Sequence, residues 1–535
     1  MVKKKHILFI LFTIVFLHSC KEKKTAPTKE STFIVDQDSI NQTIKPEFLE
    51  KENDFIKELY ASFDNKIIWN DDKNRKTLID FIKKSKEDGL FPEDYHLKEI
   101  DSFEKNKMKI SYSNYQTFDL LLSNGFKNLA DHLHKGKLNP RVLYNDWDLP
   151  YKSPIKIEKI IEAIQKNEIN DLLIDVTVKN KLYIDLKEGL KTILKKPEYK
   201  FPKTVVETKI VANDSSKTIQ IIKQKLVYWG DLSSNNGTFI YDTETIKAVK
   251  KFQQRNGLSA DGIIGKGTVD ALNYSKEKRI EQLKVNLERW KWFPEDFGEN
   301  YILINIPEYK LLFVFENDTI ETKRIVVGKP SRKTPVLTSK INNLIFNPTW
   351  TVPPTILKED LVPSASNNLS YFTRNRITIL NNKKDTINPK DWDYKNYKRY
   401  RYVQKSGYNN SLGLVKFNFP NKYMVYLHDT NHREYFSRSY RALSSGCIRL
   451  EEPLSFAKII LMKENEELWK ESKIDTLIKK ARTKVVPIKI NIKVFLLYYT
   501  CWIEKNQIIF CPDLYKLDEK LYKKLRNKSL DKTFP

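Results

Sequence analysis

The 535-residue sequence has little of what marks several protein classes. Its four cysteines are too few for a disulfide-dense scaffold. Beyond residue 20, no apolar run is long enough to span a bilayer. There is also no arginine-rich arm, zinc-finger pattern or helix-turn-helix pattern, so the net charge of +26 does not indicate nucleic acid as a partner. A lysine-rich surface explains that charge, and attraction to an anionic polymer or membrane face is the alternative.

Metal sites are also poorly supported by the sequence. His96, His132 and His134 lack both helical spacing and nearby carboxylate partners. A zinc set of Cys447, His428 and His432 has no evident fourth ligand. We therefore expect no metal and no cofactor.

The chain is nevertheless rich enough in apolar residues to fold. Hydrophobic residues make up 40% and aromatic residues 12% of the sequence, which predicts a mostly globular protein. The length predicts two to four domains. Helical periodicity in the first half and strand alternation in the second predict an α+β multidomain fold.

The N-terminus has the pattern of an export signal. A basic start, "MVKKK", comes before an eleven-residue run, "ILFILFTIVFL", that is apolar except for Thr13, and "LHSC" ends at Cys20 before a polar stretch. This resembles a bacterial lipoprotein signal, with cleavage before Cys20 and lipidation of that thiol. His18 is atypical at its position, and an ordinary signal peptide is the alternative. We expect residues 1–20 to be the signal peptide and 21–45 a linker.

Composition and periodicity divide the remaining chain into four parts. The apolar periodicity of residues 46–214 predicts a helical domain, and that of residues 215–275 predicts a smaller helical unit. Residues 276–299 predict a linker helix, and residues 300–520 a mostly β domain. Within that domain, residues 357–412 are polar and weakly periodic, which is typical of a lid or binding loop inserted in a β fold.

The smaller helical unit carries a recognisable pattern. The sequence "AVKKFQQRNGL…DGIIGKGTVDAL" predicts an amphipathic helix with Ile246, Val249 and Phe252 on one face, a glycine turn and a second helix. It resembles the three-helix peptidoglycan-binding domain found in many cell-wall enzymes. "DGIIG" is not a phosphate-binding loop, because it has neither the lysine nor the preceding strand.

The cysteines differ in what they can do. Cys501 and Cys511 flank a turn centred on Asn506, and a hairpin there would make a disulfide between them geometrically feasible. Cys447 is then left without a partner. An unpaired thiol in an exported protein raises the question of a reactive role.

The surroundings of Cys447 favour a nucleophile over a structural thiol. Ser444, Ser445 and Gly446 allow the backbone to approach a substrate with free N–H groups. The following "RLEEPLSFAKIILM" predicts a helix whose dipole, together with Arg449, would favour the thiolate. His428 ends an apolar strand 19 positions upstream and could act as the base.

The two segments together resemble a family signature. "YLHDT" followed by "SSGCIRL" is similar to the active-site motif of the L,D-transpeptidases with a YkuD-type catalytic domain. "LGLVKFNFPN", "VVGKPSRKTP" and "NPTWTVPPTI" also fit that family's β core. The helical half, notably "DGLFPEDYH", resembles the scaffold domain of the large envelope subgroup.

The resemblance implies a mechanism. Cys447 would attack the carbonyl of the third stem residue in a tetrapeptide, releasing D-alanine and forming a thioester. A diamino acid of a neighbouring stem would then attack and give a 3→3 cross-link. His428 would be the general base and acid, and carbapenems would acylate Cys447. The residues expected to shape the oxyanion hole, pocket and substrate groove are Gly446, Ser445, Ser444, Tyr426, Arg449 and Trp350.

Two other functions remain open. The acyl group of the same acyl-enzyme could be transferred to water, a free D-amino acid or a protein amine. A non-catalytic lipoprotein that tethers the membrane to peptidoglycan needs no Cys/His pair. We expect a monomer on the periplasmic face of the envelope. Its expected partners are peptidoglycan stem peptides and, through the lipid anchor, a membrane. We expect no nucleic acid as a partner.

Overall fold

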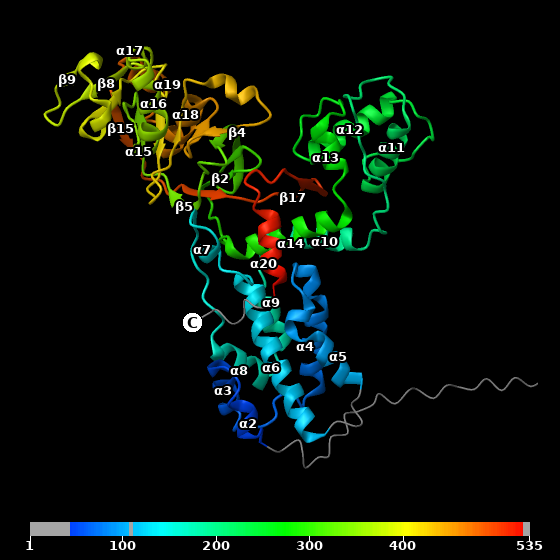
Figure 1. The fold of residues 1–535 in the computed structure, drawn as a ribbon. Coiled ribbons are helices and arrows are strands. Elements are labelled where there is room, and N and C mark those ends of the chain that lie inside the picture. Colours follow the sequence, from blue (N-terminus) through cyan, green and yellow to red (C-terminus); the bar gives the residue numbers. More distant parts are fainter. Residues whose placement is uncertain (1–42, 106–110, 528–535) are drawn as a thin grey trace, which may run out of the picture.

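The computed structural model describes residues 43–105 and 111–527, so Cys20 lies outside the described part of the chain. Figure 1 shows an elongated stalk of helices, drawn in blue and cyan, with two lobes side by side above it. One lobe is β-rich and the other is a small helical unit. Across the described ranges, no helix is both long and apolar enough to cross a membrane. The predicted α+β multidomain architecture is confirmed.

The stalk helices begin where polar side chains cap them. Asn53, Asp71 and Ser111 each accept a hydrogen bond from a backbone N–H in the first turn of the helix that follows. Asp119, buried within the longest helix, accepts from the backbone N–H groups of Ile68 and Trp69 and so anchors the loop between two helices. The elements are α2 (Pro46–Leu49), α3 (Asp54–Ala61), α4 (Asp72–Lys84), η1 (Ser85–Asp88), η2 (Pro92–Tyr95), α5 (Leu97–Lys105), α6 (Tyr112–Lys135), α7 (Pro140–Leu143), α8 (Ile157–Gln165), α9 (Ile169–Val176) and α10 (Lys181–Leu194).

The small lobe consists of three helices around a core of its own. These are α11 (Lys217–Trp229), α12 (Thr243–Arg255) and α13 (Lys266–Leu272). Val249 and Phe252 are buried on the inner face of α12, as its apolar spacing predicts. Gly262 has a φ of +77°, which a glycine adopts without strain, in the turn between α12 and α13.

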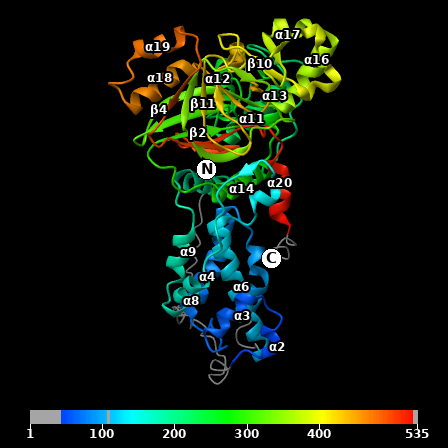
Figure 2. The same ribbon diagram turned by 90° about the vertical axis from the view of Figure 1, so that its left-hand side faces the viewer.

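The helix expected to be a linker is instead the centre of the junction. α14 (Lys276–Trp292) packs against α10 and against the C-terminal helix α20 (Asp518–Arg526). Figure 1 labels all three helices where the stalk meets the lobes, and Figure 2 shows α14 and α20 there. The Nη1 atom of Arg289, on α14, lies 2.7 Å from the Asp518 carboxylate. The C-terminal segment therefore helps to fix the lobe on the stalk.

The β-rich lobe is built on one large sheet. Its strand order is β1-β5-β16-β2-β3-β4-β14-β12-β11-β6-β15, with β13 pairing beside β4. β2 and β3 form the antiparallel pair that their alternation around a Pro-Glu turn predicts. The strands are β1 (Trp147–Asp148), β2 (Tyr301–Asn305), β3 (Lys310–Phe315), β4 (Asp318–Gly328), β5 (Val336–Lys340), β6 (Asn343–Phe346), β11 (Val415–Asn418), β12 (Leu427–His428), β13 (Ala442–Ser444), β14 (Ile448–Leu450), β15 (Lys484–Pro487) and β16 (Lys493–Leu497).

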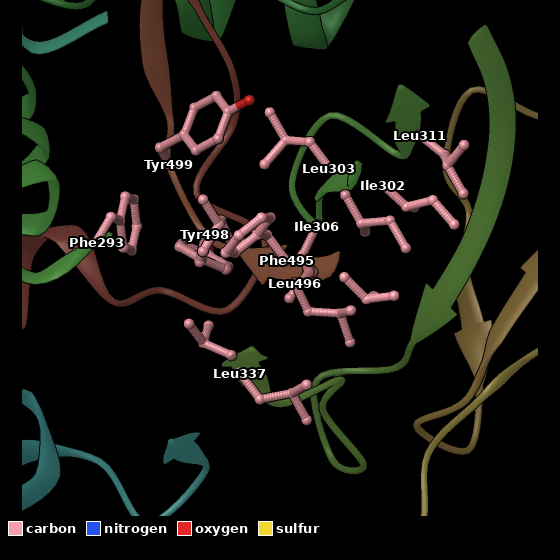
Figure 3. Packing of buried hydrophobic residues seen from close by; sticks show 14 of the residues in the cluster. Phe293, Ile302, Leu303, Ile306, Leu311, Leu337, Phe495, Leu496, Tyr498 and Tyr499 are labelled. Carbon is pink, nitrogen blue, oxygen red and sulfur yellow. The ribbon is translucent and has the colours of Figure 1, made fainter. Parts of the chain in front are cut away.

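The core of this lobe lies where the last sheet strand inserts between earlier ones. β16 pairs parallel to β2 and antiparallel to β5. Its sequence, "VFLL", is apolar on both faces, as expected of a central strand covered on each side. Figure 3 shows Phe495 and Leu496 of this strand packed among Ile302, Leu303 and Leu337. The remaining helical elements of the lobe are η7 (Arg433–Ser437), α18 (Pro453–Glu464) and α19 (Glu471–Lys479).

The polar insertion is a folded subdomain rather than a loop. Phe372, Trp392 and Tyr402 form the centre of its separate core, and their burial offsets the polar composition. Its small sheet has the order β7-β10-β8-β9. The elements are β7 (Trp350–Thr351), α15 (Pro354–Ile356), the π-helix η4 (Leu357–Leu361), α16 (Val362–Asn367), α17 (Ser370–Arg374), β8 (Ile377–Leu380), β9 (Thr386–Ile387), η5 (Pro389–Asp391), η6 (Tyr394–Arg399) and β10 (Arg401–Gln404).

The disulfide considered for the C-terminal hairpin is absent, and Cys501 and Cys511 are free thiols. The hairpin itself forms, from β17 (Cys501–Glu504) and β18 (Gln507–Phe510). Its register places Cys501 opposite Phe510, so Cys511 falls one position too far along to face it. The two sulfurs instead approach different backbone carbonyls, those of Gln282 and Pro307.

Candidate active site

Two short parallel strands bring His428 and Cys447 together. In the pairing of β12 with β14, Leu427 is opposite Ile448 and His428 is opposite Arg449. The N–H of Ile448 donates to the Tyr426 carbonyl oxygen at 3.0 Å. Because strand side chains alternate between faces, Tyr426 and His428 share one face of the sheet, and Cys447 lies next to Tyr426. The Tyr426 ring lies 5.5 Å from the His428 ring, measured between centroids.

The backbone of the next residue orients the imidazole of His428. The Nδ1 atom hydrogen-bonds to the carbonyl oxygen of Asp429, so Nδ1 carries the proton and Nε2 is the basic nitrogen. Within the described part of the chain, the hydrogen bond of the His428 ring is made by Nδ1, which leaves Nε2 free to act as a base. Burial, together with the charges of Arg449 and Lys416, lowers the pKa of His428 to about 3. The ring is therefore neutral near pH 7 and can accept a proton.

Asp429 is itself held in place on several sides. Its carboxylate accepts hydrogen bonds from the N–H groups of Leu414 and Thr430 and from the Arg433 guanidinium, at 2.7–2.8 Å. Gly413 packs directly against it, with a φ of +57°. A Cβ atom at position 413 would lie 2.1 Å from a carboxylate oxygen of Asp429, closer than atoms can approach. The position requires glycine, because any side chain would displace the residue that orients His428.

We expect Gly413→Ala to slow acylation of the protein at Cys447 by roughly tenfold or more, since misplacement by about 1 Å can cost that much. Stopped-flow or quenched-flow intact-mass measurement of the covalent intermediate would show it. Gly298→Ala is the matched control: its φ is +76°, but the new Cβ would meet only the end of the flexible Lys493 side chain, at 3.0 Å. Equal rates in the two variants would contradict this role of Gly413.

The Cys447 thiol is half-buried, and its environment differs from the one expected. Burial raises its pKa, although Tyr426, Lys416 and Arg449 act in the opposite direction. The expected helix does not start next to it: β14 intervenes, and α18 begins only at Pro453. The helix dipole acts mainly within the first turn, so it is not the source of thiolate stabilisation. The resting pair is therefore a neutral thiol beside a neutral imidazole.

Tyr426 connects the thiol to the inserted subdomain. Both the Cys447 side chain and Trp350, which lies at the start of β7, are near enough to influence the pKa of the Tyr426 hydroxyl. Burial and the neighbouring Cys447 raise the pKa of Tyr426, so its hydroxyl keeps its proton. A protonated hydroxyl beside the sulfur can donate to an oxyanion that forms there. The structure thus places Tyr426 near the thiol and Trp350 near Tyr426.

The turn before Cys447 leaves one backbone donor unused. Ser444 Oγ donates to the Cys447 carbonyl oxygen at 2.6 Å and accepts from the Gly446 N–H at 3.1 Å. The Gly446 N–H is therefore not available for an oxyanion, contrary to the expectation from the sequence. The Cys447 N–H makes no hydrogen bond to any described residue. Gly446 instead provides a φ of +117°, a conformation that favours glycine.

Ser445 lies on the exposed side of the same turn, where Arg332 reaches it. Arg332 Nη1 donates to Ser445 Oγ at 2.9 Å, and its Nε donates to the Glu359 carboxylate at 3.0 Å. Asp360 accepts from the same guanidinium. Glu359 and Asp360 belong to η4 of the inserted subdomain. Arg332, which the sequence alone did not single out, thus fastens the base of this subdomain to the loop that carries the thiol.

A metal set around the thiol is not formed. His432 is exposed, stacks on Tyr435 and approaches the Glu434 carboxylate at 3.1 Å, away from Cys447. Within residues 43–105 and 111–527, no group of three or more His, Cys, Asp or Glu side chains could hold a metal ion.

Comparisons with known proteins identify the domains of the chain. Residues 299–486 match the family model of the L,D-transpeptidase catalytic domain, residues 54–190 that of the scaffold domain, and residues 215–272 that described as "Putative peptidoglycan binding domain". A Haemophilus influenzae protein described as "Putative L,D-transpeptidase" is 39% identical over 251 residues, which are 46% of this chain and 50% of that protein. The match therefore spans about half the length of that curated relative.

Two solved structures are also similar. An L,D-transpeptidase from Stackebrandtia nassauensis is 16% identical, with a TM-score of 0.22 over 55% of this chain and 96% of that one. An L,D-transpeptidase fragment from Xylanimonas cellulosilytica is 13% identical, with a TM-score of 0.18 over 56% of this chain and 99% of that one.

Proposed function

Residues 299–486 of this chain are an L,D-transpeptidase catalytic domain, preceded by a scaffold domain and a peptidoglycan-binding domain, and we propose that the protein joins peptidoglycan stem peptides through a thioester on Cys447. The observation that carries this proposal is the pairing of the two strands that hold Cys447 and His428. Nδ1 of His428 is fixed by Asp429, which leaves Nε2 as the base.

Acylation is the first step. His428 Nε2 removes the thiol proton as Cys447 Sγ attacks the carbonyl carbon of the third stem residue, a diamino acid. The oxyanion accepts hydrogen bonds from the Cys447 N–H and the Tyr426 hydroxyl. The carbon–nitrogen bond to D-alanine then breaks, and the imidazolium of His428 returns the proton to the departing amine. A thioester and free D-alanine result.

Transfer is the second step. The side-chain amine of a diamino acid in a neighbouring stem attacks the thioester, and His428 takes a proton from this amine. The carbon–sulfur bond breaks, the imidazolium of His428 gives its proton to the departing sulfur, and the free thiol and a 3→3 cross-link remain. Water, a free D-amino acid or a protein amine could serve as the acceptor by the same chemistry. The inserted subdomain, attached through Arg332, borders the pocket at Trp350 and would select among these acceptors.

The remaining domains suit an enzyme that acts on an insoluble polymer. Residues 215–272 would bind the wall, which raises the local concentration of stems near Cys447. We place the protein at the periplasmic face of the envelope, attached by lipid on Cys20, with the helical stalk between the anchor and the catalytic lobe. A pure tether would not need the Cys447–His428 pair.

Intact-mass spectrometry with a defined tetrapeptide muropeptide tests the proposal. We expect a covalent adduct whose mass equals the substrate minus D-alanine, and an equal amount of free D-alanine. Adding an acceptor muropeptide should convert the adduct to a dimer whose cross-link can be read by fragmentation. Absence of both the adduct and free D-alanine would contradict the proposal. If the adduct yielded only hydrolysed or exchanged product, the proposed acceptor would be wrong, but the proposed acyl-enzyme would stand.

A further inference from the structure

A row of cations crosses the sheet at the catalytic histidine. Lys416 of β11 pairs with His428 of β12, and His428 pairs with Arg449 of β14. Residues paired across neighbouring strands project from the same face, so the three side chains stand side by side. The imidazole between the two cations is neutral near pH 7, because its pKa is lowered. The row thus carries two positive charges next to Cys447.

The two cations, Lys416 and Arg449, differ in their interaction partners. Lys416 Nζ lies 3.7 Å from the centroid of the Tyr426 ring, which gives it a close cation–π contact. Arg449 Nε and Nη1 are buried and have no hydrogen-bond partner. Its nearest aromatic contact is looser, with the guanidinium carbon 5.6 Å from the Tyr435 ring centroid. No ion pair with Arg449 forms within the described ranges; Glu434 nearby is exposed and approaches His432.

A half-buried guanidinium with two buried, unpaired nitrogens is costly without an anion, and its planar fork of donors fits a carboxylate. This unpaired cation next to the thiol favours an anionic group as its partner. Resting on the proposed function, the candidate anion is part of the donor stem. In a tetrapeptide, the residue that leaves is the C-terminal D-alanine, and its free carboxylate is one residue beyond the carbonyl that Cys447 attacks.

We infer that Arg449 binds the terminal carboxylate of the donor stem and thereby makes the site select tetrapeptides. Arg449 lies two residues beyond Cys447, which is about 7 Å along an extended chain. The arginine side chain is long enough to span part of that distance. In a pentapeptide the same position is occupied by a neutral amide, and the carboxylate lies about 3.5 Å farther along the peptide. Arg449 would then remain unpaired, and acylation would be slower.

The test compares three donors with the unmodified protein: the tetrapeptide acid, its C-terminal amide and the pentapeptide. A charge-assisted pair is expected to favour the acid over the amide by roughly tenfold or more in the acylation rate. The pentapeptide should behave like the amide. Equal rates for acid and amide would overturn the inference while leaving the thioester chemistry intact. Failure to form an adduct with any donor would instead remove the proposed function.

Variants then assign the preference to a residue. In Arg449→Gln the acid-to-amide ratio should fall to about one, whereas Arg449→Lys should retain part of it. Lys416→Gln is the matched control, because it removes the other cation of the row and should keep the ratio at roughly tenfold or more. If the acylation rates with acid and amide fell equally in Arg449→Gln, the role of Arg449 would be merely structural and the assignment would be overturned. Loss of the acid-to-amide ratio in Lys416→Gln would also overturn it. Calorimetric binding of acid and amide to the Cys447→Ala protein should show the same preference without chemistry.

Discussion

Replacing Cys447 with alanine should abolish the acyl-enzyme and lower product formation by at least about 10⁴-fold, as loss of a nucleophile does in other covalent enzymes. Among the described residues, the other thiols cannot substitute. Cys501 and Cys511 are buried in the C-terminal hairpin, and burial raises the pKa of both. The measurement is intact mass and free D-alanine after incubation with a tetrapeptide muropeptide.

The same variant separates catalysis from wall binding. Cys447 is small and half-buried, so removing its sulfur leaves only a minor gap, and the fold should be retained. Sedimentation with purified sacculi should therefore be the same for Cys447→Ala and the unmodified protein, because residues 215–272 form a separate unit with its own core. Cross-links made by the alanine variant at the original rate would contradict the assignment of the nucleophile.

Replacing His428 with glutamine should lower the acylation rate by about 10²–10⁴-fold, the range that a positioned general base contributes. Glutamine roughly preserves the size and polarity of the side chain but cannot take the thiol proton. His432→Gln is the matched control, since His432 is exposed four residues away and stacks only on Tyr435. Equal losses in the two variants would show that His428 is not the base.

The pH dependence follows from the directions of the two pKa shifts. The pKa of His428 is lowered to about 3, so its proton-accepting form persists as the pH falls through the usual histidine range. The pKa of the Cys447 thiol is raised, so the thiol stays protonated at and below neutral pH. The neutral pair is therefore fully present from about pH 5 to pH 8, and acylation should be nearly constant over that range.

Alkylation reports the same pair without a substrate. Iodoacetamide reacts with the thiolate, so its reaction with Cys447 should be slow at pH 7 and rise about tenfold per pH unit above that. A fast, pH-independent reaction between pH 5 and pH 7 would reveal a resting thiolate–imidazolium pair and overturn the neutral-pair description. Mass spectrometry of peptides containing residue 447 gives the rate for that thiol alone.

Local sequence patterns were enough to predict part of the candidate active site. The candidate nucleophile Cys447, the candidate base His428, the three-helix unit and the strand-rich second half follow from short-range signals: a small-residue turn, an apolar strand end and amphipathic spacing. The insertion between β7 and β10 was recognised as different but not as folded. Its core depends on three aromatic residues that meet only after a small sheet forms, and periodicity does not reveal such contacts.

Register decided what the local patterns left open. A shift of one residue in the C-terminal hairpin keeps Cys511 from facing Cys501. The expected helix dipole at Cys447 is absent because three residues join the sheet as β14 before α18 begins. Asp429 holds His428 through its backbone oxygen, an atom that every residue possesses, so no residue type could have signalled it.

The sequence by itself determined which residues are chemically able to react and which domains carry them, because residue type and spacing along the chain are properties of a single segment. Only the tertiary structure decided that Lys416 and Arg449 flank His428, that Arg332 ties Ser445 to the inserted subdomain, and that Tyr426 lies near both the thiol and Trp350. These contacts join segments tens of residues apart. They set the charge and solvation of the pocket, which depend on distance in space rather than along the chain.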